Sequence, residues 1–378
     1  MKTLGIVAEY NPFHNGHAFH LDRAKTIVGA KYTIAVMSGN FVQRGEPAIV
    51  DKRTRTHMAL HAGVDIVLEL PLQCAAASAK YFARGAVGLL AATGVVDAIA
   101  FGAEAKLAEL KEAARLVREE PYADALKEGL SRGLSYPRAR AEAVGGRIGD
   151  ILRGPNNILA IEYINAIEML EGHIECIAIG RTVAHNDGMI GGFASASCLR
   201  RMLLSGQDIS EFVPNHTREL LEAYGCLHSL DNLSGLFHYR IRMLGPEGLR
   251  NIAEVSEGLE HRILRCARET YLISDIITRI KTKRYTQSKI RRIILYIVLG
   301  VTRDRLQEPP GCIRLLGMRK GSEELLRRIS QASSLPLITT PRGKVTDHAS
   351  TNTYYLSATT HDKRLEDARQ EYRLPTFI

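Results

Sequence analysis

The sequence predicts an α/β protein, in which a parallel five-stranded sheet is covered by helices on both faces and followed by a mainly helical region. Short apolar strands alternate with helical segments in the first half of the chain. These strands are continuously apolar, as expected for a sheet buried on both faces. Beyond about residue 206 the strand pattern fades, and helical spacing of apolar residues dominates from Ile209 to Leu299.

The strands and helices are expected in alternating order. The predicted strands are Thr3–Ala8, Tyr32–Met37, Asp65–Leu70, Val95–Phe101 and Ile174–Ile179. The predicted helices are His17–Val28, Asp51–Ala62, Ala75–Ala92, Ile158–Leu170 and one that follows Ser195. Asp51 and Ser195 are expected N-caps, because their side-chain oxygens accept hydrogen bonds from the first helical turn.

Two further regions complete the predicted organisation. Residues near 105–155 show several helical segments that break near Pro121 and Pro137, which predicts a helical insertion. Cys312–Leu316 and Leu335–Thr340 are candidate short strands. We therefore expect a first domain over residues 1–206 that carries the insertion, and a mainly helical second domain over residues 207–378.

Composition narrows the class of protein. The net charge is +9, from 50 Lys and Arg against 41 Asp and Glu, which favours an anionic partner or simply a basic solvated surface. The six cysteines form no Cys-x-x-Cys pair, so a zinc site or redox motif is not expected. We expect these cysteines to be reduced thiols of a cytoplasmic protein. The N-terminus is not typical of a signal peptide, and no apolar run is long enough for a membrane span.

The strongest motif follows the first strand. His14-Asn15-Gly16-His17 is a His-x-Gly-His element on a turn that leaves a buried strand and enters a helix. A helix N-terminus offers unpaired N–H groups and partial positive charge to phosphates. Gly16 permits close approach of a ligand, and His14 and His17 fall on the same side of the first turn. Two such imidazoles can stabilise a phosphate whose charge grows during displacement.

Other polar residues lie at the carboxyl ends of the predicted strands, where ligands bind in doubly wound sheets. Each has a structural and a functional interpretation. Gly102 is either a turn residue or a contact to the nucleotide, and Asn156 and Asn157 either cap a helix or recognise the nucleotide. Arg181 and Arg44 are either surface charges or phosphate ligands. Ser195, Ser197 and Arg200 are either a second phosphate-binding group or an ordinary helix cap. His185 and Asp187 either form a polar site or simply lie in a loop, and the loop is the favoured interpretation.

A basic run lies in the second half. Residues 281–292 carry six basic side chains, interleaved with a tyrosine and hydroxyl groups. Most such runs are solvated faces, but this mixture also suits an RNA backbone. The candidate RNA-binding residues are Lys281, Lys283, Arg284, Lys289, Arg291 and Arg292.

These motifs together resemble the bacterial tRNA(Met) cytidine acetate ligase family. The resemblance rests on VAEYNPFHNGHAFH (Val7–His20), SGNFVQRGEPA from Ser38, FGAE from Phe101, PNNIL from Pro155, and Arg181. EGLEHR (Glu257–Arg262), KTKRYT (Lys281–Thr286) and IRLLGM (Ile313–Met318) extend it into the second half. One departure is Ser195-Ala196-Ser197-Cys198-Leu199-Arg200, where the family often has Ser-Ala-Thr-x-Ile-Arg.

The resemblance implies a Rossmann-like nucleotidyltransferase fold of the HIGH type and a helical C-terminal region that holds tRNA. It also implies ATP-dependent N4-acetylation of the wobble cytidine of elongator tRNA(Met) through acetyl-adenylate, with release of AMP and pyrophosphate. His14 and His17 would be catalytic. ATP would contact Gly102, Asn157 (favoured over Asn156), Arg181 and the whole first stretch: Val7, Ala8, Glu9, Tyr10, Asn11, Pro12, Phe13, His14, Asn15, Gly16, His17, Ala18, Phe19 and His20.

The expected substrates are ATP, acetate and the tRNA, and Mg²⁺ is compatible with the phosphate chemistry although no protein metal site is predicted. An alternative is an adenylyltransferase that acts on a small phosphorylated metabolite, and another is a non-catalytic RNA-binding protein regulated by ATP. How acetate is selected, which tRNA features are recognised and whether the chain oligomerises stay open.

Overall fold

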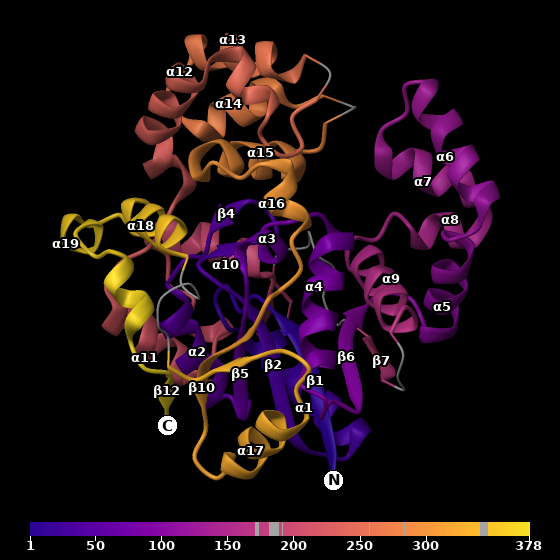
Figure 1. Ribbon diagram of the computed structural model, residues 1–378, viewed down its shortest axis with the longest axis vertical. Coiled ribbons are helices and arrows are strands. Elements are labelled where there is room, and N and C mark those ends of the chain that lie inside the picture. Colours follow the sequence, from indigo (N-terminus) through magenta and orange to yellow (C-terminus); the bar gives the residue numbers. More distant parts are fainter. Residues whose placement is uncertain (171–173, 181–188, 191, 257, 283–284, 341–346) are drawn as a thin grey trace.

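The computed structural model describes residues 1–170, 174–180, 189–190, 192–256, 258–282, 285–340 and 347–378. Its centre is an eight-stranded sheet in the order β11-β10-β5-β2-β1-β6-β7, with β12 paired to β10 (Figure 1). The strands are β1 (Lys2–Ala8), β2 (Ala30–Ser38), β5 (Ile66–Leu70), β6 (Ala98–Ala103), β7 (Glu175–Gly180), β10 (Ile313–Met318), β11 (Leu337–Ile338) and β12 (Thr376–Phe377).

The five predicted strands form the parallel part of this sheet. β5, β2, β1, β6 and β7 are parallel to one another, which confirms the predicted parallel sheet. The sheet is wider than predicted because β10 pairs with β5 in antiparallel orientation and brings β11 and β12 with it. The candidate strands near residues 312 and 335 are therefore part of the same sheet.

Helices cover both faces of the parallel strands. On one face α1 (Asn15–Val28) and α2 (Lys52–His61) pack on alternate residues of β1 and β2. On the other face lie α4 (Ala79–Ala92) and α9 (Pro155–Glu168). Asp51 caps α2 by accepting from the Thr54 amide, as predicted.

The helix predicted over Ala75–Ala92 begins later than expected, as α4 at Ala79. Ala75 instead ends a short preceding helix, α3 (Leu72–Ala75). The Ala76 carbonyl between the two helices accepts a hydrogen bond from the Tyr296 hydroxyl, which comes from the second half of the chain. This bond ties the junction of α3 and α4 to a distant helix.

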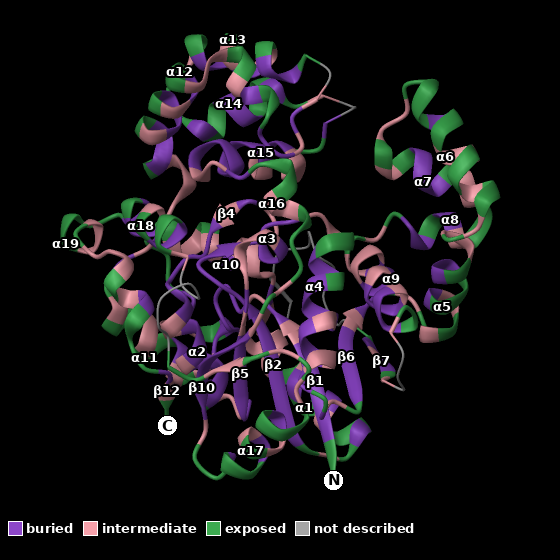
Figure 2. Ribbon diagram, viewed as in Figure 1, coloured by how far each residue is buried: buried purple, intermediate pink, exposed green. Residues whose placement is uncertain are grey.

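The insertion begins with a helix packed on the core and then projects away from the sheet, at the right of Figure 1. It contains α5 (Leu107–Leu116), α6 (Glu120–Ser131), α7 (Tyr136–Val144) and α8 (Gly146–Ile151). Pro121 and Pro137 lie in the first turns of α6 and α7, where proline fits because no intrahelical N–H is lost. Most of the surface of α6 and α7 is exposed or half-buried (Figure 2).

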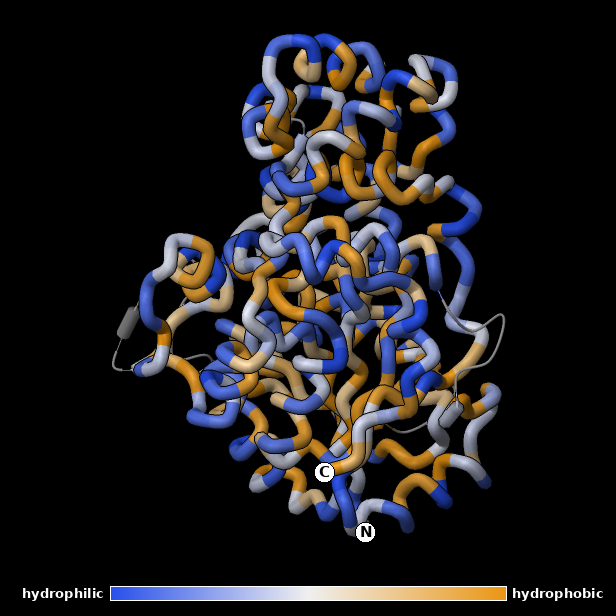
Figure 3. The backbone as a smooth tube through the Cα atoms, turned by 90° about the vertical axis from the view of Figure 1, so that its left-hand side faces the viewer, coloured by the Kyte–Doolittle hydropathy of each residue, from blue (hydrophilic) through white to orange (hydrophobic). Residues whose placement is uncertain are grey.

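The upper lobe in Figures 1 and 3 is helical, as predicted for the second half. It contains α12 (Ser234–Arg250), α13 (Leu259–Glu269), α14 (Ile273–Ile280) and α15 (Gln287–Leu299). The remaining helices are α10 (Ala196–Leu204), α11 (Asn215–Tyr224), α16 (Arg303–Gln307), α17 (Glu323–Ala332), α18 (His348–Leu356) and α19 (His361–Arg364), and the short strands are β3 (Phe41–Val42), β4 (Glu46–Pro47), β8 (Met189–Ile190) and β9 (Phe193–Ala194).

The two halves share a hydrophobic core. The core of the helical lobe includes Phe41 and Ala76 from the first half and Tyr354 from α18. The Tyr354 hydroxyl donates to the Ala48 carbonyl at 3.0 Å. Since residues 313–318 also return to the sheet, we propose a helical domain of about residues 230–307 instead of one that continues to residue 378.

The chain direction places the functional residues. β1 begins near the N mark at the bottom of Figure 1, so the carboxyl ends of the parallel strands face the helical lobe and the insertion. No helix among the described residues is long and apolar enough to cross a membrane.

Candidate nucleotide-binding site

A cavity of about 540 Å³ lies at the carboxyl ends of β1, β6 and β7. Its volume is in the range of small-molecule sites. One side consists of the end of β1 and the start of α1, and another of Gly102 on β6 and Gly180 on β7. The predicted convergence of strand-end residues at one edge of the sheet is therefore present in the structure.

The two motif histidines meet at the start of α1. His14 is the N-cap residue and is buried, and its ring stacks on that of His17 with centroids 3.7 Å apart. The backbone N–H of His14 donates to His17 Nδ1 at 3.3 Å. Because Nδ1 accepts this bond, a neutral His17 carries its proton on Nε2. The N-terminal end of the helix adds partial positive charge.

The Val7–His20 stretch divides into lining residues and supporting residues. The cavity is lined by Val7, Ala8, Glu9, Tyr10, His14, Gly16, His17, Phe19 and His20. Asn11, Pro12, Phe13, Asn15 and Ala18 do not line it. Phe13 is fully buried, Asn11 Oδ1 accepts from the Ile49 amide at 2.7 Å, and Asn15 Nδ2 donates to the Gly192 and Glu211 carbonyls at 3.0 Å. These residues hold the turn in place.

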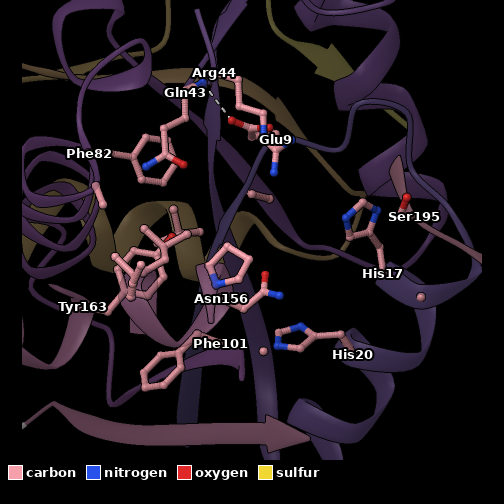
Figure 4. A pocket seen from close by; sticks show the side chains of 18 of the residues that line it. Glu9, His17, His20, Gln43, Arg44, Phe82, Phe101, Asn156, Tyr163 and Ser195 are labelled. Carbon is pink, nitrogen blue, oxygen red and sulfur yellow. Dashed lines mark hydrogen bonds between the residues drawn. The ribbon is translucent and has the colours of Figure 1, made fainter. Parts of the chain in front are cut away.

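Aromatic rings form the wall opposite the histidines. In Figure 4, His17 and His20 come from α1, while Phe82, Phe101 and Tyr163 lie across the cavity. The ring centroids of Phe101 and Tyr163 are 5.7 Å apart. Burial raises the pKa of the Tyr163 phenol well above its usual value, so it stays protonated. The cavity therefore combines an apolar wall, suited to a base, with a polar wall, suited to phosphates.

The adjacent asparagines have different roles. Asn157 is buried, and its Oδ1 accepts from the amides of Glu104 and Ala105 at 2.9 and 3.0 Å. Asn156 is the one that lines the cavity (Figure 4). The family resemblance favoured Asn157, but its side chain is buried and holds two backbone amides. Asn156 Nδ2 donates to the Glu104 carboxylate, yet this side chain lines the cavity. We therefore propose Asn156 as the residue that contacts the nucleotide.

A family model described as HIGH Nucleotidyl Transferase matches residues 1–372. A relative from Thermoanaerobacter sp. (strain X514), named tRNA(Met) cytidine acetate ligase, is 41% identical over 358 residues, which cover 90% of this chain and 88% of the relative. A relative of the same name from Acetivibrio thermocellus is 40% identical over 364 residues, which cover 89% and 88%. The chain belongs to the tRNA(Met) cytidine acetate ligase family.

Solved structures agree with this assignment. The chain resembles Thermotoga maritima TmcAL bound with alpha-thio ATP, with a TM-score of 0.89 and 34% identity over 100% of both chains. It resembles the apo form of the same protein with a TM-score of 0.92 and 33% identity, again over 100% of both chains.

Only one of the three residues predicted as a second phosphate-binding group, Ser195, Ser197 and Arg200, lines the cavity. Ser195 lines it and caps α10 by accepting from the Cys198 amide, as predicted. Ser197 and Arg200 line a neighbouring hollow instead. The Arg200 guanidinium donates to the Asn11 carbonyl at 2.9 Å and to Glu46 at 2.8 Å. We therefore propose that Arg200 supports the His-x-Gly-His turn.

The predicted RNA-binding run extends from Lys281 at the end of α14 into the first turns of α15, and its described residues differ in environment. Lys281 is exposed, and Lys289 lies over the Tyr285 ring at 5.4 Å. Arg291 pairs with Glu46 at 3.4 Å, and Arg292 binds both oxygens of Glu254 at 2.9 and 3.0 Å. These two arginines are thus engaged within the protein. Lys283, Arg284 and Arg181 lie outside the described residues, as do His185 and Asp187.

The close packing of α15 on the first half explains one glycine. Gly45 has φ of +76°, and a Cβ there would lie 2.4 Å from the Arg292 backbone nitrogen. Any side chain would therefore separate the loop from α15.

Several lining residues were not predicted. Tyr136, Pro137 and Arg140 line the cavity from the insertion, and Thr286 and Ser288 line it from α15 together with Arg292. The α15 group lies inside the basic run and could have been proposed from it. No motif in the sequence marks the three residues of the insertion as cavity residues, since only the folded chain brings α7 to the cavity.

The cavity has little acidic character. Among the described residues that line it, Glu9 is the only carboxylate, and its Oε1 accepts from the Gln43 amide at 2.8 Å. Within the described parts of the chain, no cluster of three or more His, Cys, Asp or Glu side chains could hold a metal ion. A metal bound chiefly by ligand phosphates fits this donor set better than a resident one.

Proposed function

We propose that this chain is an ATP-dependent acetate ligase that forms N4-acetylcytidine at the wobble position of elongator tRNA(Met). One observation carries this proposal furthest beyond the family assignment. The start of α15, which belongs to the basic run, lines the same cavity as His14 and His17. A nucleotide site and a candidate RNA-binding segment therefore adjoin each other, as expected if an activated intermediate is consumed by RNA.

The first step joins acetate to the nucleotide. An acetate oxygen attacks the α-phosphorus of ATP, the bond to the β-phosphate oxygen breaks, and pyrophosphate leaves. His17 Nε2–H and the N-terminus of α1 stabilise the negative charge that develops on the α-phosphate. His14 stacks on His17 and fixes its ring, so the donor is preorganised.

The second step transfers the acetyl group. The exocyclic N4 of cytidine attacks the carbonyl carbon of acetyl-adenylate, AMP leaves with the electrons of the carbonyl–oxygen bond, and N4 loses a proton. The mixed anhydride is already reactive, so holding the two reactants in contact supplies much of the rate. The wobble base is accessible because anticodon-loop bases can be unstacked.

Mg²⁺ would accompany the phosphates of ATP and neutralise their charge, and Glu9 is the carboxylate that the described cavity lining offers to it. Chelation is expected to slow pyrophosphate release without lowering the melting temperature of the ligand-free protein, since no described cluster would lose a structural metal.

The test is direct. The protein is incubated with ATP, acetate and unmodified elongator tRNA(Met), and the digested RNA is examined for N4-acetylcytidine by mass spectrometry. Product that requires both ATP and acetate supports the proposal. If the protein binds ATP but makes no product, the function is wrong, and pyrophosphate release with small phosphorylated metabolites would identify an adenylyltransferase instead.

A charge-reversal pair tests the RNA-binding segment. Lys281→Glu with Lys289→Glu is expected to weaken tRNA binding and to reduce the salt dependence of that binding. Acetate-dependent ATP–pyrophosphate exchange, which needs no RNA, should be unchanged. A fall in exchange equal to the fall in tRNA acetylation would contradict an RNA role for these lysines.

A further inference from the structure

One aromatic residue at the cavity has no role in the steps described above. Tyr136 is the first residue of α7 in the insertion, and it lines the cavity with 49% of its surface exposed. Among the described lining residues, Phe19 is the other large apolar side chain that remains exposed, at 37%, and its ring makes an edge contact with Phe193. Tyr136 is thus a solvent-accessible ring at the mouth of the cavity.

The ring of Tyr136 is supported from one side. The guanidinium carbon of Arg140, one helical turn later, lies over the ring at 5.8 Å from its centroid, within cation–π range. Arg140 is itself buried, with Nε donating to the Tyr122 hydroxyl at 3.1 Å and its guanidinium 3.6 Å from Glu162. These contacts hold the guanidinium in place against the Tyr136 ring.

The reaction requires such a surface. The wobble base must leave the anticodon stack so that N4 can reach the acetyl carbonyl, and an unstacked base is usually held against an aromatic ring. The buried rings of Phe82, Phe101 and Tyr163 line the interior, where a base attached to a large RNA has less access. Tyr136 lies on the rim and belongs to the same cavity as the start of α15.

We propose that Tyr136 is the stacking platform for the target cytosine, and that the helical insertion therefore forms the second wall of the RNA site opposite α15. This inference rests on the proposed function, because it names the residue that receives the base in the second step. It assigns Tyr136 to binding of the nucleobase and not to formation of acetyl-adenylate.

The experiment separates the two steps of the reaction. In Tyr136→Ala, kcat/KM for tRNA is expected to fall by about 10- to 100-fold, the range for loss of one base–aromatic stack. Acetate-dependent ATP–pyrophosphate exchange, measured without RNA, should stay within about twofold of the unaltered protein. Tyr136→Phe and Tyr136→Trp should retain tRNA acetylation because they keep a ring, whereas Tyr136→Leu should not.

Matched controls distinguish the outcomes. Tyr81→Ala removes another exposed tyrosine of the first half, one that does not line the cavity, and should leave both activities unchanged. An unchanged kcat/KM for tRNA in Tyr136→Ala, or full activity in Tyr136→Leu, would overturn the inference. A raised KM for ATP in the exchange reaction would also overturn it by assigning the ring to adenine. If the unaltered protein forms no N4-acetylcytidine, the proposed function itself has failed.

Discussion

Two polar regions at the same edge of the sheet differ in how their charges are balanced. The first is the nucleotide cavity, whose described lining contains three arginines and three histidines against the single carboxylate of Glu9. The second, the charge cluster, consists of Lys52, Glu69, Arg314 and Glu371. Two cations face two carboxylates there, so the cluster is neutral.

The side chains of the charge cluster are all paired with one another and shielded from solvent. Lys52 Nζ lies 2.7 Å from both Glu69 and Glu371, and Arg314 lies 2.9 Å from Glu69 and also contacts Glu371. Pairing with Lys52 and Arg314 outweighs burial and lowers the pKa of Glu371 to about 2. The comparison shows that a balanced cluster serves folding. In the cavity, Arg140 and Arg292 pair with Glu162 and Glu254, which lie outside the lining, so the histidines and the N-terminus of α1 are what suit it to an anionic ligand.

The largest expected effect is on stability, from the charge cluster. Glu371→Gln leaves two buried cations with one carboxylate, so we expect a loss of about 3–5 kcal/mol in the free energy of unfolding. Urea denaturation at pH 7 measures this loss. The control Glu324→Gln removes one partner of an exposed pair with Arg327 and should cost less than about 1 kcal/mol. Equal losses in the two variants would contradict the distinction between closed and exposed pairs.

The next effect is on catalysis, from the cavity. His17→Ala removes a donor aimed at developing negative charge, so we expect acetate-dependent ATP–pyrophosphate exchange to fall by about 100- to 1,000-fold, with little change in stability. The control His361→Ala alters an exposed histidine of α19 and should be neutral. Normal exchange in a His14→Ala, His17→Ala double variant that is still folded would exclude the proposed role.

A third prediction concerns pH, at another closed site. Burial lowers the pKa of His228 to about 4, although Asp51 and a bond with Tyr354 oppose this shift. The unfolded chain binds the proton near pH 6.5, so it is protonated before the folded one, and stability should fall by roughly 3 kcal/mol as the pH drops from about 6.5 to about 4. Urea denaturation across this range tests the prediction, because His228→Gln should flatten that part of the profile. An unchanged slope would assign the pH dependence to other groups.

The smallest expected effect comes from the asparagine pair, in which Asn156 lines the cavity and Asn157 supports the fold. Asn156→Ala should raise the KM for ATP by about tenfold or less and leave stability nearly unchanged. Asn157→Ala should destabilise the fold by about 1–3 kcal/mol, because two backbone amides lose the acceptor that the buried Asn157 side chain provides. Thermal melting and exchange kinetics on both variants decide the assignment. The reverse pattern would restore Asn157 as the nucleotide contact.

Much of the fold was predictable because it depends on local patterns. Continuous apolar segments identified the five parallel strands, and Asp51 and Ser195 were correctly predicted as caps. The pattern could not reveal that β10 would pair antiparallel to β5, since residues about 250 positions apart must meet for that to happen. The non-helical residues before α4 were also missed; the Ala76 carbonyl there accepts from the Tyr296 hydroxyl of a distant helix, a contact that no local pattern reveals.

For the site, the sequence by itself determined the motif and its chemistry, since His14, Gly16 and His17 depend only on a strand that runs into a helix. Only the tertiary structure decided which neighbours face the cavity. Asn156 and Asn157 look alike in sequence, yet the buried Asn157 side chain accepts from the backbone amides of Glu104 and Ala105. Likewise, Arg200 is occupied by Glu46, whereas Tyr136 reaches the rim from a separate insertion. Side-chain partners are set by packing between distant segments, and no local pattern encodes that choice.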